Sequence, residues 1–514
     1  MMTGRPAFLP WHRVYLLAFE QAIVNQALKL ADSAQYKAEA AKIRLPYWDW
    51  AKQKVAGLPS VVKEARVSVR ISKDRREDID NPLYSYKFGT ERIDIFPEPE
   101  TKRHPDKNGH SQPDLVEAEI GKKRPWETVY PMLTENRKFS YLSTIGTAKA
   151  NSLEDIHNGM HNAIGGEGGH MKYPLVSAFD PVFWLHHVNI DRYYALWQAM
   201  HPTAHYEPIF SSTGDPNAAS FDPKDPKHKF NDPLAPFYTN EEGTPWNIAM
   251  IQRVSPSGSN ITTFDRGYHY PETTLHTSKE ATEDEVRGKV TKLYGPKSNN
   301  EFPNGAIALS SLPKIPGWAQ SLPASAAIRH EWAIYYKIER YIVKPNYTLL
   351  FFFGHPGNNP AEWHASPYRV GSFYSFKSTL ESCTNCTQQQ AANTLTSGEV
   401  RVTDSLLKGL GSTKLDDVPN VEAWLKDKLT WRILKDDGTE HVPARREGDT
   451  TRELPLGLAV GVKSCMISYP PQSELETGRG YDLNKVVGLT FDWRHHRKVT
   501  EARVFRGGVT PKTT

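Results

Sequence analysis

Two pairs of histidines are the residues of this sequence best suited to bind a metal ion. His157 and His161 stand four positions apart in IHNGMH, and His186 and His187 are adjacent in DPVFWLHHVNIDR (180–192). On a helix, side chains four positions apart lie on one face, so His157 and His161 can share one ion. Adjacent helical positions point about 100° apart, so only one histidine of the second pair is expected to face the same site. Copper, zinc, iron and nickel all accept imidazole ligands.

Other interpretations of the first pair have to be weighed. A zinc-protease site needs Glu directly after the first histidine, and this sequence has Asn158 there. Two surface histidines at helical spacing remain an alternative. Glu154 and Asp191 lie one turn from the nearest histidine, so these carboxylates are candidates to orient the imidazole rings.

Three helices are predicted to position the histidines. Ser152, with Asp155 three residues later, is typical of a helix start, and this helix should span about 153–164. Asp180-Pro181 predicts a second helix that reaches about residue 200. A long amphipathic helix over 11–43 places His12 on its apolar stripe. Two imidazoles from one helix and one from the next would form a three-histidine site in a helix bundle.

The rest of the chain changes character along its length. Residues 53–150 are irregular and charged, and they predict surface loops with short helices. From about residue 331, segments such as EWAIYYKIERYIV and YTLLFFFG are aromatic or β-branched and of strand length, which predicts a second, mostly β domain.

Composition excludes several classes of protein. The chain has 514 residues, 38% of them hydrophobic, a net charge of +4 and three cysteines. We therefore expect no nucleic-acid partner, no membrane span and no disulfide scaffold, and we expect a cytoplasmic location.

A set of short motifs extends these observations. FLPWHRVYLLAFE, PYWDW, HNGMH, GGHM and DPVFWLHHVNIDR follow one another between residues 8 and 192, GYHYP occupies 267–271, and CTNC occupies 383–386. With them the chain resembles the tyrosinase and catechol oxidase family of type 3 dinuclear copper enzymes, in particular fungal tyrosinases with a C-terminal shielding domain.

The resemblance implies an α+β multidomain fold. A mainly helical copper domain with a four-helix-bundle core would span 1–275, a linker with short helices 276–330, and a mostly β, sandwich-like shielding domain 331–514.

The resemblance also implies two copper ions, each held by three histidines. His157, His161 and His187 would hold the second copper, and His12 would be the third ligand of the first. The first copper's other two ligands should precede His12, one of them nine positions upstream. Thr3 stands there, and residues 1–11 contain no histidine. We therefore expect this chain to lack two ligands of the first copper, to hold one copper ion, and to be incomplete at its N-terminus.

Further roles follow from the resemblance. Glu154 and Asn158 would hold a water that takes the phenol proton, and Phe183 would line the substrate approach. Cys383 and Cys386 would receive copper; half of a zinc site and an inert turn remain alternatives. An aromatic of GSFYSF (371–376) would plug the substrate site.

The implied function is copper-dependent phenol oxidation. O2 would oxidise monophenols such as tyrosine at the ortho position and catechols to o-quinones, in melanin or pigment synthesis. The alternatives are a catechol oxidase without monophenol activity, an inactive truncated form, and an oxygen-binding type 3 copper protein. The oligomeric state is not predicted.

Overall fold

The structure is a computed structural model. It describes residues 6–52, 57–72, 74–89, 98–136, 138–145, 152–202, 204, 233–251, 270–275, 279–280, 283–295, 304–315, 317–320, 324–344, 346–378, 380, 383–391, 393–411, 414–442, 457–469 and 494–500.

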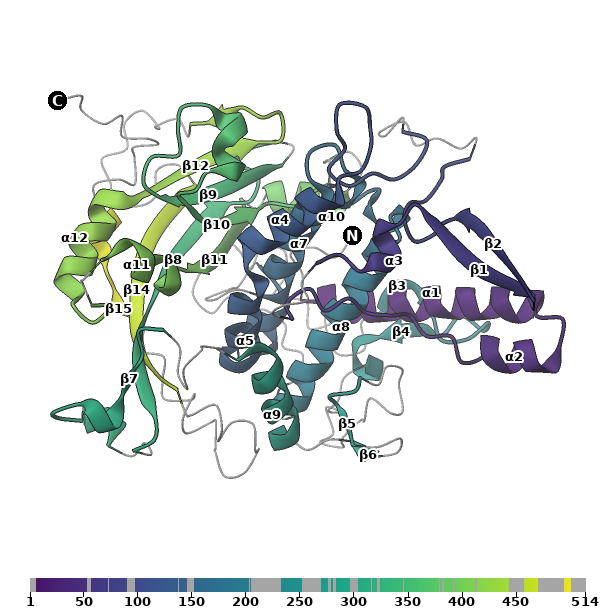
Figure 1. The fold of residues 1–514 in the computed structure, drawn as a ribbon, viewed down its shortest axis with the longest axis horizontal. Coiled ribbons are helices and arrows are strands. Elements are labelled where there is room, and N and C mark those ends of the chain that lie inside the picture. The colour runs from purple at the N-terminus through teal and green to yellow at the C-terminus, as the bar shows by residue number, and fades with distance from the viewer. Residues whose placement is uncertain are drawn as a thin grey trace.

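The chain forms a helical part followed by a part made mainly of strands (Figure 1). The predicted α+β fold class is therefore confirmed. The proposed boundaries at 275 and 330 stay predictions; β8 begins at Ala327, and helix α9 (Glu283–Tyr294) packs against α5 and α8 of the helical part.

Helices α7 and α8 form the centre of the helical part. Helix α7 packs against α4, α5 and α8, and α8 packs against α1, α5 and α9 as well. The helices of this part are α1 (Phe8–Leu30), α2 (Ala34–Ala40), α3 (Ser60–Lys63), α4 (Pro113–Lys123), α5 (Pro125–Glu135), α6 (Phe139–Ser143), α7 (Leu153–Gly165) and α8 (Val182–Met200). Short antiparallel strand pairs accompany them: β1 (Arg66–Ser72) with β2 (Arg75–Asp80), β3 (Pro233–Tyr238) with β4 (Pro245–Asn247), and β5 (Thr274–Leu275) with β6 (Lys279–Glu280).

The starts of α7 and α8 follow from their capping residues. The Ser152 hydroxyl accepts a hydrogen bond from the Asp155 backbone N–H at 3.1 Å, as expected of an N-cap. At the start of α8, Asp180 Oδ1 accepts from the Val182 N–H at 3.0 Å. Both predicted helices are confirmed to within about two residues.

Two predictions about the N-terminal region are wrong in part. The helix expected over 11–43 begins at Phe8 and breaks after Leu30, because Ser33 adopts an extended conformation and caps a separate helix, α2. The segment 53–150, expected to form surface loops with short helices, contributes α4 and α5 to the core through buried residues such as Ile120 and Leu133.

The strand-rich part consists of two antiparallel sheets with a shared apolar core. One sheet has the order β11-β8-β14-β15 with β7 beside β8, and the other has the order β10-β9-β12-β13. Aromatic and aliphatic side chains of both sheets meet in one buried cluster, as the sandwich-like prediction requires. The strands are β7 (Ile307–Ala308), β8 (Ala327–Glu339), β9 (Tyr347–Phe353), β10 (Arg369–Tyr374), β11 (Leu395–Arg401), β12 (Leu429–Lys435), β13 (Glu440–His441), β14 (Leu458–Tyr469) and β15 (Arg494–His495), with helices α10 (Thr384–Ala391), α11 (Thr403–Gly409), α12 (Val418–Lys428) and α15 (Arg497–Thr500).

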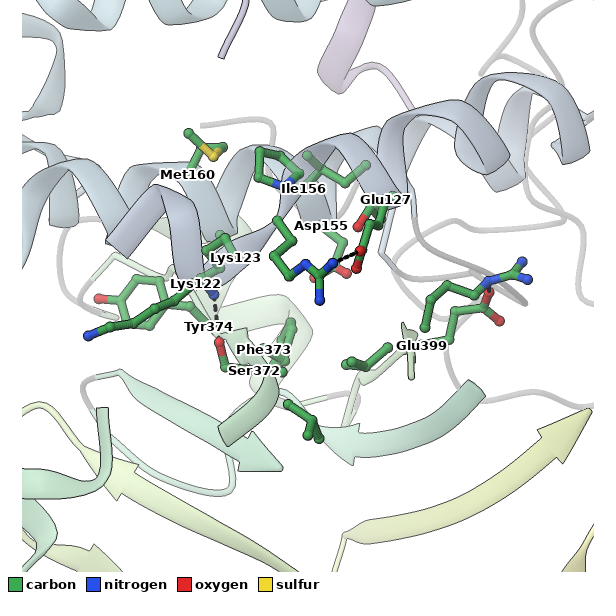
Figure 2. A pocket seen from close by; sticks show the side chains of 18 of the residues that line it. Lys122, Lys123, Glu127, Asp155, Ile156, Met160, Ser372, Phe373, Tyr374 and Glu399 are labelled. Carbon is green, nitrogen blue, oxygen red and sulfur yellow. Dashed lines mark hydrogen bonds and ion pairs between the residues drawn. The ribbon is translucent and has the colours of Figure 1, made fainter. Parts of the chain in front are cut away.

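Polar contacts join the two parts along a seam, where α4, α5 and α7 face β10 and β11. A cavity of about 90 Å³ lies in this seam, and Figure 2 shows Lys123 reaching across it to Ser372. The Lys123 ammonium donates to Ser372 Oγ at 2.8 Å. Ion pairs cross the seam at Glu119–Arg369 (3.2 Å), Glu135–Arg401 (2.6 Å) and Lys172–Asp436 (3.1 Å).

Among the described residues, no helix is both long and apolar enough to span a bilayer.

Replacing Lys123 by Met should change how thermal stability depends on pH. Burial lowers the pKa of the Lys123 ammonium to about 8 from its ordinary 10.5. Between these values the unfolded chain binds more protons, so Lys123 costs stability below pH 8 and the cost disappears as pH rises to 10.5. The pKa difference corresponds to about 3 kcal/mol as an upper limit.

The thermal midpoint of Lys123→Met, minus that of the natural chain, should therefore fall between about pH 7 and about pH 10. The control is Lys122→Met, which removes the neighbouring ammonium that pairs with Glu119 beside the seam. A difference that is constant with pH, or equal in the control, would contradict the burial of a charged Lys123.

Candidate metal centre

Three imidazole nitrogens converge between α7 and α8. His187 Nε2 lies 3.2 Å from His157 Nε2 and 3.3 Å from His161 Nε2. All three side chains are buried. Two nitrogen ligands at about 2.0 Å from one ion, at tetrahedral angles, lie about 3.3 Å apart. The spacing of these nitrogens therefore fits a single metal ion, and His157, His161 and His187 are the residues that would hold it.

Hydrogen bonds at the far side of two rings determine which nitrogen faces the site. His161 Nδ1 donates to the Met171 carbonyl at 2.7 Å, and His157 Nδ1 donates to Asn158 Oδ1 at 2.9 Å. Because each Nδ1 carries the proton, each Nε2 has a free lone pair directed at the metal position. The orienting groups are thus a backbone carbonyl and an amide.

The carboxylates expected to orient the rings have other contacts. Asp191 accepts from Arg13 Nε at 2.6 Å and from the Tyr270 hydroxyl at 2.7 Å, so it supports α1 and α8 instead. Glu154 is fully buried and accepts from the Ile145 N–H at 3.2 Å.

Glycines allow Met171 to reach His161. A Cβ on Gly169 would lie 1.9 Å from the Gly165 carbonyl oxygen, so only glycine permits the turn after α7 to fold against the helix end. This close approach places residues 170–172 beside α7 and brings the Met171 carbonyl to the imidazole. The GGHM motif therefore serves the metal centre through backbone geometry.

His186 lies in the same cluster but has its lone pair engaged elsewhere. The ligating atoms of His157, His161, His186 and His187 all lie within 4.8 Å of one another. Among the described residues, this is the one group of three or more His, Cys, Asp or Glu side chains that could hold a metal ion. The Trp50 indole N–H donates to His186 Nδ1 at 3.1 Å. His186 Nδ1 is thus the acceptor and its proton sits on Nε2, so this ring has no lone pair left for a metal.

Burial keeps these rings in the neutral form that binds metals. Desolvation is the largest cause that lowers the pKa of His161 to about 3 and holds the pKa of His157 and His187 well below the ordinary value. The neighbouring imidazoles lower it further. Near neutral pH the ligand set therefore does not have to lose protons before it binds an ion.

His12 lies at the edge of the centre. Its ring stacks on His187 with centroids 4.6 Å apart, and its Nδ1 donates to the Phe8 carbonyl at 2.7 Å. Burial lowers its pKa to about 4. Helix α1 thus presents a neutral, oriented imidazole next to the three-histidine set. Its role as a ligand of another copper, and the lack of two further ligands for that ion, stay predictions.

Aromatic side chains and one amide complete the surroundings. The Phe183 ring lies 4.1 Å from the His187 ring, which agrees with its expected place near the metal. Asn158 Nδ2 is buried and has no protein hydrogen-bond partner in the described structure, so one donor remains available beside His157.

The strand-rich part inserts one aromatic side chain into the centre. Phe376, the residue after Ser375 in GSFYSF, places its ring 4.4 Å from His161 and 5.6 Å from His157. Its backbone φ is +36°, a conformation uncommon for residues with a side chain. The sequence analysis expected an aromatic of 371–376 at the substrate site. Phe376 is the residue of this segment whose ring lies beside the centre, and its role as a plug stays a prediction.

The two cysteines of CTNC are joined in a disulfide. A role in receiving Cu(I) needs thiolates, so it requires the reduced pair and stays a prediction. Tyr270 of GYHYP is described, whereas residues 267–269 lie outside the described residues.

Sequence reasoning missed the roles of Trp50 and Met171. Trp50 belongs to PYWDW, a motif that we noted without a function, and its partner is 136 residues away. Met171 acts through its backbone carbonyl, which no side-chain pattern encodes.

Comparisons with known proteins identify the family to which the chain is similar. Residues 1–200 match the sequence model of the common central domain of tyrosinase, and residues 331–448 match that of the tyrosinase C-terminal domain. The chain is 28% identical to polyphenol oxidase 2 of Agaricus bisporus over 454 residues, which covers 84% of this chain and 77% of that protein. It is also 28% identical to a tyrosinase of Podospora anserina over 477 residues, with 78% and 80% covered.

A comparison with solved structures shows the same fold. A structure of recombinant mushroom tyrosinase has a TM-score of 0.67 to this chain at 22% identity, with 91% of this chain and 82% of that chain covered. The chain belongs to the tyrosinase family, whose members use copper.

Replacing His186 and His187 separately should show which of the two binds copper. His187→Phe should weaken copper binding at least about tenfold, because one of three ligands is lost. His186→Phe should leave copper affinity within about threefold and lower the thermal midpoint, since the Trp50 N–H loses its acceptor.

Both variants keep an aromatic ring at the exchanged position, so each is the control for the other. Copper affinity is measured by competition with a chelating dye. Equal losses in the two variants would contradict the exclusion of His186 from the ligand set.

Proposed function

We propose that this chain is a copper-dependent phenol oxidase that uses O2 to convert phenols and catechols into o-quinones. The observation that carries the proposal is the convergence of His157, His161 and His187 Nε2 atoms at the spacing of one metal ion. Related proteins named tyrosinase and polyphenol oxidase support it. A role in pigment synthesis is part of the proposal.

The chain's own groups would bind the substrate and take its proton. Phe183 offers an aromatic face beside His187 on which a phenol ring can stack. Glu154 and Asn158 lie in the first two turns of α7, where the free Asn158 amide and the Glu154 carboxylate would hold a water. This pair would accept the phenol proton, because phenol has a pKa near 10 and reacts as phenolate. Bound copper would supply the redox chemistry with O2.

The strand-rich part would keep the enzyme latent. Phe376 occupies the face of the centre formed by His157 and His161, where a phenol ring would need to approach. The segment around it is held firmly: Asn346 Oδ1 accepts from Ser375 Oγ at 3.0 Å and from the Lys377 N–H at 2.6 Å. Substrate access then requires Phe376 to leave, through opening of the seam or removal of the strand-rich part.

Oxygen uptake with a catechol tests the function directly. The full chain, loaded with copper, is expected to hold one ion per chain. O2 consumption with catechol that His187→Ala abolishes would support the proposed function, and no consumption by the natural chain would support the inactive form. The same assay with tyrosine separates monophenol oxidation from catechol oxidation alone. Catechol-dependent uptake that persists in His187→Ala would contradict the assignment of the centre.

Replacing Phe376 by a smaller residue should raise the rate of catechol oxidation. Phe376→Ala should increase kcat/KM for catechol at least about tenfold, because an aromatic ring no longer has to be displaced from the substrate face. Tyr368→Ala is the matched control, an exposed aromatic before β10 on the same segment. If both variants, or neither, become faster, Phe376 is not the group that limits access.

A further inference from the structure

The segment that carries Phe376 rests on a buried arginine. Arg340, the residue after β8, is 1% exposed, and its Nη2 donates to the Phe376 carbonyl at 3.3 Å. Its Nε and Nη1 atoms are buried and have no hydrogen-bond partner in the described structure. No carboxylate of the described residues forms an ion pair with this guanidinium. The Tyr341 side chain lies near this guanidinium, yet two of the donor nitrogens of Arg340 have no acceptor within hydrogen-bond distance among the described residues.

A second buried cation lies next to it. Lys377 is 3% exposed, and its ammonium donates to the carbonyls of Arg340 at 2.9 Å and Val343 at 2.7 Å. Both partners are neutral. The nearby carboxylate, Asp436, pairs with Lys172 at 3.1 Å instead. Burial and then the Arg340 charge lower the pKa of Lys377 to about 7, which agrees with a local excess of positive charge.

Thr394, the residue before β11, provides one more buried polar group without a hydrogen-bond partner among the described residues. The Arg340 N–H donates to the Thr394 carbonyl at 2.9 Å, so the two residues are adjacent. Thr394 Oγ1 is buried and has no partner in the described structure. Two cations and a hydroxyl, beside a carboxylate that already pairs with Lys172, form an environment that a bound anion would stabilise, since buried charges are normally paired.

We propose that Arg340 and Lys377 form a binding site for a small oxyanion, and that the bound anion holds Phe376 in the metal centre. Arg340 Nε and Nη1 lie on different edges of the guanidinium, so each offers a single free donor near the Lys377 ammonium. Oxyanions accept such charged N–H donors through several oxygens at once, which a halide cannot do. The same guanidinium donates to the Phe376 carbonyl, so an anion that fixes Arg340 also fixes the plug. Binding of the anion does not depend on the proposed function of the chain. Its effect on substrate access to the metal centre rests on that proposed function.

Binding is tested on the full chain without copper, with inorganic phosphate as the probe. At constant ionic strength, replacing chloride by phosphate should raise the thermal midpoint in a saturable manner. Arg340→Gln and Lys377→Met should each weaken the apparent phosphate affinity at least about tenfold. Lys344→Met, which removes an exposed lysine close by, should leave the affinity unchanged.

Lys377→Met keeps the length of the side chain and removes a buried charge, so we expect this variant to fold. If Arg340→Gln fails to fold, Lys377→Met alone still tests the site. A midpoint that does not respond to phosphate, or a response unchanged by both exchanges, would overturn the site.

The link to the plug is tested with the copper-loaded chain. Phosphate should lower catechol turnover of the natural chain and should have no effect on turnover of Phe376→Ala, although that variant still binds phosphate in the thermal assay. Equal inhibition of both would overturn the link. Failure of the proposed function would appear as no turnover in either protein and would leave the binding result standing.

Discussion

Everything in the metal centre depends on the hydrogen bond from His161 Nδ1 to the Met171 carbonyl, together with its counterpart from His157 to Asn158. These bonds fix the proton on Nδ1, so both Nε2 lone pairs point at one place. A metal site of neutral imidazoles has no net charge that would attract an ion, and preorganised lone pairs are what the protein can offer. The fold around α7 holds this arrangement: a serine cap starts the helix, and Gly165 and Gly169, where a Cβ would clash with the backbone, let the Met171 carbonyl approach.

The hydrogen-bond partners of the side chains near the centre determine which of them can bind a metal ion and which stabilise the surrounding helices. His186 and His187 are neighbours on one helix, yet Trp50 occupies the lone pair of one and leaves the other free. Arg13, Asp191 and Tyr270 hold α1 against α8, which keeps His12 stacked on His187. The strand-rich part adds Phe376 from outside, across a seam made of ion pairs and hydrogen bonds. Polar contacts of this kind can separate in water at lower cost than an apolar interface, which is compatible with the proposed opening of the seam.

Sequence reasoning found the parts of the site that are encoded locally. The spacing of His157 and His161, the Ser152 cap and the Asp180 start are short-range signals, and the structure confirms the helices that they predicted. The strands β8 and β9 followed from runs of apolar residues. Residues 53–150 were misjudged because α4 and α5 are charged on their exposed faces, and only a few buried positions such as Val116 mark the helices. Trp50 and Met171 act over long sequence distances or through the backbone, and Arg340 becomes unusual only once folding buries it beside Lys377.

X-ray absorption spectroscopy of the full chain loaded with one equivalent of copper tests the central claim most directly. The account predicts a copper ion with three imidazole nitrogens at about 2.0 Å, and a spectrum that loses one imidazole in His161→Ala but is unchanged in His186→Phe. A spectrum dominated by oxygen or sulfur ligands, or one that does not respond to loss of His161, would contradict it.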